Sequence, residues 1–205
     1  MEADEKMGYY IRVLALETRV LTLAELRHSV PKGQELNVET GEESDWSQLI
    51  LQHNGGNEIS LIERNPVIPG ELGEEELKEF IEEVKDEKPQ SAANWLVQFL
   101  PRIKAIYAFQ LLSGTDERNG WAGVHALQNH IWSRLGGILQ ADLEGFSNED
   151  GYHILWQFHK DHEGPWKMAV LGPDLKWIAF EMRLENPNHR EYFLNGRVPP
   201  GVKYL

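Results

Sequence analysis

The sequence predicts an α+β fold in which antiparallel sheets are covered by helices packed on one side. Two observations predict this class. Short runs of β-branched and aromatic residues recur along the chain, separated by turns rich in Gly, Asn, Asp and Pro. Segments with apolar residues at helical spacing fall between groups of these runs and do not alternate with single strands.

The N-terminal third is expected to be mostly strand, with one short helix. Thr22 begins this helix, because Thr22 and Glu25 fit a capping box in which each side chain binds the backbone N–H of the other residue. The linker HNGGN at 53–57 suits a hairpin, since Asn and Gly readily adopt positive φ angles. The expected strands are residues 8–16, 34–40, 46–53 and 58–64.

Helices and strands both follow in the rest of the chain. The clearest helix is 74–84, which carries a single apolar stripe opposite Glu and Lys residues. Ser91 is expected to cap a second helix that ends before Pro101, and Asn119 to cap a third that runs to Leu135 with Trp121 on its inner face. Strands are expected at 103–112, 138–143, 152–158, 166–171 and 176–184, followed by an irregular apolar tail at 185–205 that packs on the body.

The expected domain organisation is simple. Residues 1–7 are read as a disordered tail and 8–205 as a single globular domain. Within it, the order strand, helix, strand, strand, strand occurs twice. This order predicts pseudo-duplicated halves at 8–70 and 103–184, joined by a helical connector at 74–100, as a hypothesis about topology.

Composition excludes several classes of function. The chain has a net charge of −13 at pH 7 and no cysteine. The acidity argues against binding to nucleic acid or an anionic membrane, and it favours a basic protein partner steered by the acidic stretches 35–45 and 71–87. The N-terminal residues MEADEKMGYY lack the pattern of a signal peptide, and no apolar run is long enough to span a membrane, so a cytoplasmic location is expected.

The main candidate residues lie in QADLEGFSNEDGYHILWQF, residues 140–158. If 138–143 continues as a strand, Gln140, Asp142 and Glu144 share one face, with the carboxylates about 7 Å apart. That spacing suits general acid–base chemistry, with His153 facing Asp142 as a proton-transfer partner. The alternative is a half-solvated sheet face on which His153 is only a cross-strand hydrogen-bonding partner.

Two stretches of the sequence contain residues that could bind a metal ion. His159 and His162, with Asp161 or Glu163, have suitable ligand chemistry, but H-x-x-H in a turn lacks the i, i+4 geometry of a helical zinc site. The turn GFSNEDG at 145–151 lacks the spacing of an EF-hand. We therefore expect no metal and no cofactor, and the nucleophile-elbow, P-loop and dinucleotide motifs do not occur in the sequence.

A binding surface is the other interpretation of this region. Phe146 either anchors its loop in the core or is an exposed contact residue. Trp177 and Glu181 share the less buried face of the last strand, where an aromatic residue beside charges suits a binding surface. The expected binding residues are Gln140, Phe146, Asn148, Trp177 and Glu181.

Three functional hypotheses follow. The first is a non-enzymatic cytoplasmic binding protein that engages a protein partner through its acidic surface and exposed aromatic residues; in general profile, though in no residue motif, it resembles the toxin-neutralising immunity proteins of bacteria. The second is a small acid–base enzyme of the hydrolase type, with Asp142 and Glu144 as the pair and Gln140 and His153 orienting the substrate. The third is a homodimer that uses an uncovered sheet face.

Overall fold

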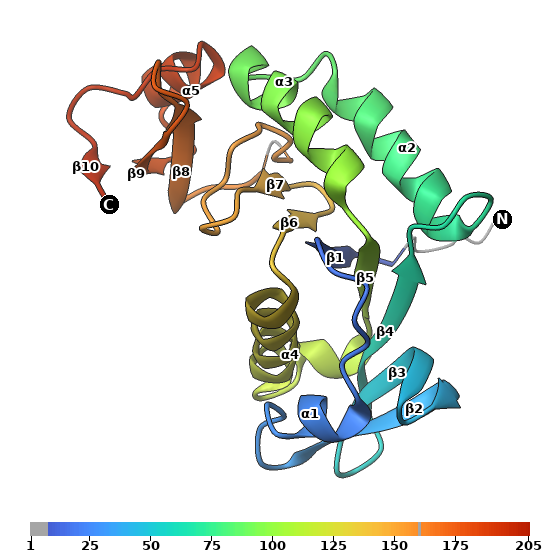
Figure 1. The fold of residues 1–205 in the computed structure, drawn as a ribbon. Coiled ribbons are helices and arrows are strands. Elements are labelled where there is room, and N and C mark those ends of the chain that lie inside the picture. Colours follow the sequence, from blue (N-terminus) through green and yellow to red (C-terminus); the bar gives the residue numbers. More distant parts are fainter. Residues whose placement is uncertain (1–7, 160) are drawn as a thin grey trace, which may run out of the picture. The chain divides into compact units, whose positions relative to one another are not determined.

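The computed structural model describes residues 8–159 and 161–205, and the chain forms two compact units (Figure 1). Unit 1 comprises the chain up to Pro66 together with Lys104–Gly136. Unit 2 comprises Val67–Ile103 and Gly137–Leu205. The units do not follow the expected halves 8–70 and 103–184, because Lys104–Gly136 belongs with the N-terminal strands. The duplication remains a prediction, and the expected tail at 1–7 lies outside the described residues.

Unit 1 is built on an antiparallel sheet with the strand order β2-β3-β4-β5-β1. The central strand β5 is almost wholly apolar and fully buried over its first five residues, as the run of Ile, Tyr and Phe predicts. The expected α+β class with antiparallel pairing is confirmed. The strands are β1 (Tyr10–Ala15), β2 (Gln34–Glu42), β3 (Asp45–His53), β4 (Glu58–Pro66) and β5 (Ala105–Leu111).

Two α-helices and one 3-10 turn pack on this sheet: α1 (Leu23–Arg27), η2 (Ser113–Asp116) and α4 (Gly120–Leu135). Helix α4 packs on β1, β3 and β4. Trp121, expected on its inner face, is 41% exposed instead. Gly123 takes the inner position in that turn, where an added Cβ would overlap the Gln34 side chain and lie 3.0 Å from that of Leu51. The helix approaches the side chains of β2 and β3 too closely there for a large residue.

The expected capping box of α1 is present. The Thr22 hydroxyl accepts from the Glu25 backbone N–H at 3.3 Å, and the Glu25 carboxylate accepts from the Thr22 N–H at 2.8 Å. These bonds from Thr22, with the Arg19 guanidinium at 2.9 Å, lower the pKa of Glu25 to about 2. A helix of only five residues depends on such end contacts, because it has few internal hydrogen bonds.

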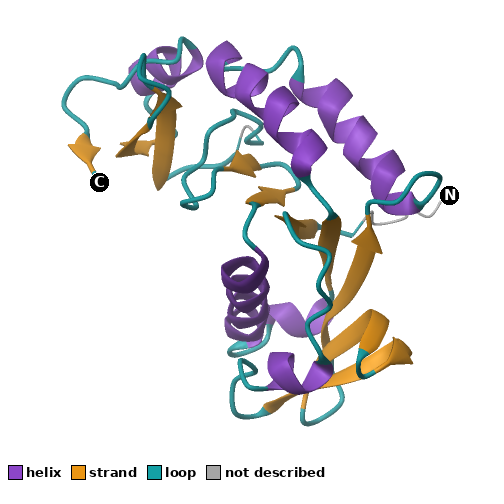
Figure 2. Cartoon of the chain, in the orientation of Figure 1, coloured by secondary structure: helices purple, strands orange, loops and turns teal. Residues whose placement is uncertain are grey.

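Unit 2 holds a helical pair, a small hairpin and a second sheet with the order β10-β9-β8 (Figure 2). Helices α2 and α3 lie side by side, and α3 also packs on β8. The elements of unit 2 are α2 (Leu72–Val84), α3 (Gln90–Phe99), η1 (Leu100–Arg102), β6 (Ile138–Ala141), β7 (Gly145–Ser147), β8 (Pro165–Leu171), β9 (Trp177–Arg183), α5 (Pro187–Leu194) and β10 (Lys203–Tyr204). No helix among the described residues is long and apolar enough to cross a membrane.

Two local expectations for unit 2, the strand at 152–158 and the Ser91 cap of α3, are wrong. Residues 152–158 form no strand, and only His153 makes isolated bridges, to Ser147 and Met168. The alternating apolar residues reflect burial instead, because the backbone N–H groups of this segment bind three different segments: His153 to Lys167, Ile154 to Phe146 and Trp156 to Lys88. The cap of α3 is Pro89 in place of Ser91.

The expected irregular tail contains a helix. Asn186 caps α5 by accepting from the backbone N–H groups of Asn188 and His189, and Pro187 occupies the first turn. An Asn cap followed by Pro is a helix-start signal, which the sequence interpretation passed over. The tail does pack on the body as expected: Phe193 is fully buried in the core formed around Met168, Phe180 and Met182.

The capping box gives a first prediction. Replacing Thr22 with Ala should lower the free energy of unfolding by about 1 kcal/mol, because the Glu25 N–H loses its acceptor. Chemical denaturation followed by circular dichroism measures this. Thr22→Ser keeps the hydroxyl and serves as the control, so an equal loss in both variants would contradict the capping role.

Candidate functional site

The hairpin β6–β7 positions the acidic candidates, but not on one strand face. Strand β6 ends at Ala141, which pairs with Gly145, so Asp142, Leu143 and Glu144 form the connecting turn. Leu143 (φ 61°) and Gly145 (φ 105°) adopt the left-handed backbone that this tight reversal requires. The expectation that Gln140, Asp142 and Glu144 share a strand face is therefore wrong. Gln140 is buried in β6, whereas both acids are half-buried in the turn.

Glu144 lies between two imidazoles. Its Oε2 atom is 4.0 Å from Nε2 of His153, and its Oε1 atom is 3.8 Å from Nε2 of His162. The Glu144 and His162 side chains are 23% and 29% exposed, so solvent reaches this end of the cluster. We call Glu144, Ser147, His153 and His162 the imidazole cluster, and all four residues belong to unit 2.

His153 is the buried member of the imidazole cluster. Its Nδ1 atom is 3.1 Å from the Ser147 hydroxyl, whereas its Nε2 atom is buried and has no hydrogen-bond partner among the described residues. Burial, with a smaller repulsion from His162, lowers the pKa of His153 to about 4, because a charged imidazole is poorly solvated there. His153 is therefore neutral at neutral pH.

Aromatic rings enclose the cluster. The Phe158 ring stacks on His153, with the ring centroids 5.1 Å apart and an interplanar angle of 23°. Trp166 meets His153 and Phe158 edge to face, both at 4.8 Å, and His162 at 6.2 Å. Since Phe158 is buried and Trp166 only half-buried, these rings exclude water from one side of His153 and leave an aromatic surface next to His162.

The arrangement presents one donor and one acceptor to a bound group. The carboxylate facing Nε2 favours the His153 tautomer with its proton on Nε2, which leaves Nδ1 to accept from the Ser147 hydroxyl. For an oxygen atom about 2.8 Å from both His153 Nε2 and Glu144 Oε2, the angle between the two hydrogen-bond directions is about 90°. A hydroxyl group or a water molecule meets this requirement, because it accepts one hydrogen bond and donates another.

Two of the expected binding residues, Phe146 and Asn148, are fully buried. Phe146 is fully buried and packs edge to face on Phe80 at 5.6 Å, so it anchors its loop in the core and is not an exposed contact residue. Asn148 is also fully buried, and its Oδ1 accepts from the backbone N–H groups of Asp150 and Tyr152. It holds the polar turn together.

Trp177 and Glu181 lie on β9, apart from the imidazole cluster in sequence. Trp177 is half-buried and packs edge to face against Trp95 of α3 at 5.1 Å. Glu181 lies opposite Lys167 on one neighbouring strand and Lys203 on the other. Their share in a binding surface remains a prediction.

Sequence reasoning missed Ser147 as a partner of His153 and assigned His153 to Asp142 in place of Glu144. Of the two histidines considered as metal ligands, His159 contacts Asp161 at 3.2 Å and His162 lies 3.8 Å from Glu144. No set of three His, Cys, Asp or Glu side chains within 8–159 and 161–205 is arranged to hold a metal ion. No pattern in the sequence signals the contact between Ser147 and His153, because the chain between them forms an irregular turn and no continuous strand.

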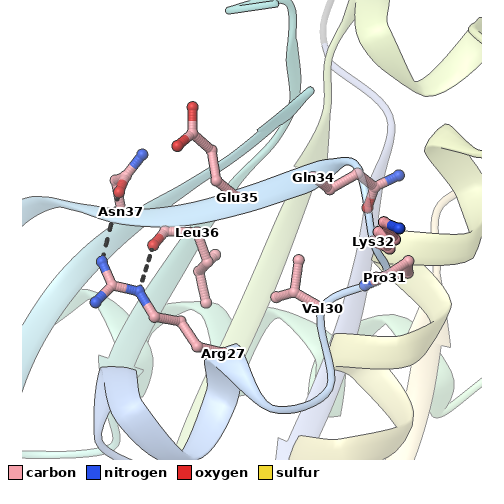
Figure 3. A pocket seen from close by; sticks show the side chains of 8 residues that line it. All are labelled: Arg27, Val30, Pro31, Lys32, Gln34, Glu35, Leu36 and Asn37. Atoms are coloured by element: carbon pink, nitrogen blue, oxygen red, sulfur yellow. Dashed lines mark hydrogen bonds between the residues drawn. The ribbon is translucent and has the colours of Figure 1, made fainter. Parts of the chain in front are cut away.

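Unit 1 contains a separate open pocket of about 390 Å³ between the end of α1 and β2 (Figure 3). Arg27 lines it, and its guanidinium donates to the Leu36 carbonyl at 3.0 Å and to Asn37 Oδ1 at 3.5 Å. A contact at 3.5 Å to Glu43 completes its partners. The bond to Leu36 occupies a backbone carbonyl of the edge strand β2 and so hinders pairing of this edge with another chain. We therefore interpret this pocket as part of the covering of the strand edge and not as a ligand-binding site.

Comparison with known protein families, with curated proteins and with solved structures found no match to this chain.

The burial of His153 predicts how stability depends on pH. An unfolded histidine binds a proton near pH 6.5, whereas folded His153 does so only near pH 4. Between these values the unfolded state binds more protons, so stability falls as the pH drops, by roughly 3 kcal/mol in total. No such loss arises from this residue above pH 6.5.

Urea unfolding of the wild type and of His153→Gln at pH 7.5 and pH 4.5 measures this linkage. The wild type should lose more stability than the variant by that amount. Parallel losses in the two proteins would contradict the prediction. An NMR titration of the His153 ring in the wild type is an independent check, since the ring should stay neutral down to about pH 4.

Proposed function

We propose that unit 2 carries an acid–base active site of the hydrolase type, with Glu144 as the general base and His153 as the residue that orients the attacking water. The observation that carries this proposal is the buried, neutral His153, whose Nε2 atom lies 4.0 Å from the Glu144 carboxylate and has no hydrogen-bond partner among the described residues. Buried polar atoms usually have a partner, and strongly shifted pKa values such as that of His153 cluster at functional sites.

The chemistry needs only groups of the imidazole cluster. The Nε2–H group of His153 donates to a water oxygen, and Glu144 Oε2 accepts a proton from that water as it attacks. His162, whose Nε2 is 3.8 Å from the other oxygen of Glu144, lies at the solvent-exposed end of the cluster and serves as the general acid that donates a proton to the leaving oxygen. One bond to the leaving group breaks, and one bond to the water oxygen forms.

Ser147 serves this reaction indirectly. Its hydroxyl donates to Nδ1 of His153 and thereby keeps the proton of the neutral ring on Nε2, where the water binds. The hypothesis from the sequence made Asp142 the second proton-transfer residue. We assign this role to His162 instead, because His162 contacts Glu144.

A second candidate is the binding protein that was the first hypothesis from the sequence. The observation that favours it is helix α2, which carries six Glu and one Lys within Leu72–Val84. Glu75 and Glu79 are exposed on this helix. Such a surface would attract a basic protein partner at long range and would be screened by salt.

Glu144 provides the test of the enzyme. In Glu144→Gln the side chain keeps its shape but no longer accepts a proton, so kcat/KM should fall by roughly 10²- to 10⁴-fold. The measurement is hydrolysis of a panel of nitrophenyl glycosides and phosphoesters. Glu149→Gln is the matched control, because Glu149 is exposed in the next turn and lies outside the cluster. Equal rates for Glu144→Gln and the wild type, or no hydrolysis of any substrate, would refute the enzyme.

The binding candidate predicts that an oligolysine peptide shifts the NMR amide signals of α2 more than those of the rest of unit 2. Raising the salt concentration from about 50 mM to about 500 mM should abolish these shifts, because the Debye length falls to a few ångströms. Glu75→Lys with Glu79→Lys should remove them at low salt. Shifts spread evenly over the chain would count against a defined acidic binding face.

A further inference from the structure

We propose that the imidazole cluster takes a neutral, hydroxyl-bearing ring, that is, a carbohydrate. This inference rests on the proposed function and names the substrate class of the same site. It selects between the two classes, glycosides and phosphoesters, that acid–base chemistry of this kind leaves open. Three features of the cluster support the choice.

The first feature is the hydrogen-bonding pattern between His153 and Glu144. The Nε2 atom of His153 and the Oε2 atom of Glu144 are 4.0 Å apart, and they offer one donor and one acceptor. Each hydroxyl of a sugar has the complementary pair, one acceptor and one donor. His153 Nε2, which has no hydrogen-bond partner among the described residues, gains one when a hydroxyl group, of a sugar or of water, is bound.

The second feature is charge. His153 is neutral and Glu144 contributes a carboxylate next to it. A phosphoester would place its negative charge against this carboxylate at a distance where Coulomb repulsion is large in a partly buried site. A sugar ring brings no charge and meets no such penalty. The net charge of −13 adds a long-range repulsion against any anionic substrate.

The third feature is the aromatic surface. Trp166 is half-buried, and its ring lies within 6.2 Å of His162 and 4.8 Å of His153, measured between ring centroids. The C–H face of a pyranose ring stacks on an indole, which places the ring hydroxyls to the side. Both imidazoles that flank Glu144 contact the Trp166 ring. Ligand sites combine apolar walls and a few polar groups in this way.

The test measures binding separately from turnover. NMR titrations use Glu144→Gln, whose amide oxygen still accepts a hydrogen bond from a sugar hydroxyl but no longer accepts a proton. The neutral probes are cellobiose, maltose and diacetylchitobiose, and the charged probe is glucose 6-phosphate. At least one neutral disaccharide should shift the Trp166 indole and His162 ring signals with a dissociation constant on the order of 1 mM. It should bind more tightly than glucose 6-phosphate.

Variants of two tryptophans assign the site. Trp166→Leu in the same background should weaken binding by about tenfold or more, and Trp166→Phe, which keeps a ring and guards against a folding defect, should weaken it less. Trp177→Leu is the matched control, since Trp177 is the half-buried tryptophan of the neighbouring strand and packs on Trp95. Binding should survive that change.

The outcomes separate this inference from the proposed function. If no neutral disaccharide shifts the cluster at about 10 mM, or if glucose 6-phosphate binds more tightly, the carbohydrate inference is wrong. Hydrolysis of another substrate that depends on Glu144 would then still support the enzyme. If a disaccharide binds at Trp166 but the wild type hydrolyses no substrate, the carbohydrate inference holds and the proposed enzyme fails.

Discussion

The burial of His153 is the constraint on which the rest of the unit 2 site depends. Its backbone N–H donates to Lys167 and its carbonyl accepts from Ala169, which fixes the segment after the polar turn along β8. Its side chain then reaches Ser147 of β7 and stacks on Phe158. One residue thus joins the hairpin, the irregular segment and the second sheet. The position of Glu144 opposite Nε2 follows from these attachments, because the turn that carries Glu144 begins at the same hairpin.

This arrangement has a cost in stability. Burial holds His153 neutral, and its Nε2 atom, which has no partner among the described residues, loses the hydrogen bonds that bulk water supplies to an exposed imidazole. A core built for stability alone would hold an apolar residue at position 153, like the fully buried Phe146 and Phe180 of this chain. Functional sites often keep such unfavourable groups, since a ligand that satisfies them gains the difference as binding energy. The carboxylate beside Nε2 is in keeping with that interpretation.

Local signals predicted much of the fold. The capping box of Thr22 and Glu25, the glycine-rich hairpin before β4 and the apolar stripe of α2 each depend on neighbouring residues, and each was found at its expected place. The strand expected at 152–158 failed because alternation reports only which side chains are buried. Its backbone groups bind three segments that lie far apart in the sequence, and no pattern within seven residues encodes those partners.

The site shows the same limit more sharply. Glu144 and His153 were singled out because acids are unusual in strands and because histidine titrates near neutral pH, which are properties of single residues. The partners predicted for these two residues were wrong. Strand β6 ends two residues earlier than expected, and the resulting turn brings Glu144 toward the imidazoles. The positive φ angle of Leu143 decides this, and leucine gives no sequence signal for it. A shift of two residues in the turn therefore replaces the expected pair of carboxylates on a sheet face with one carboxylate between two imidazoles. The chemistry of the observed arrangement differs, because only there does a buried hydrogen-bond donor face the base.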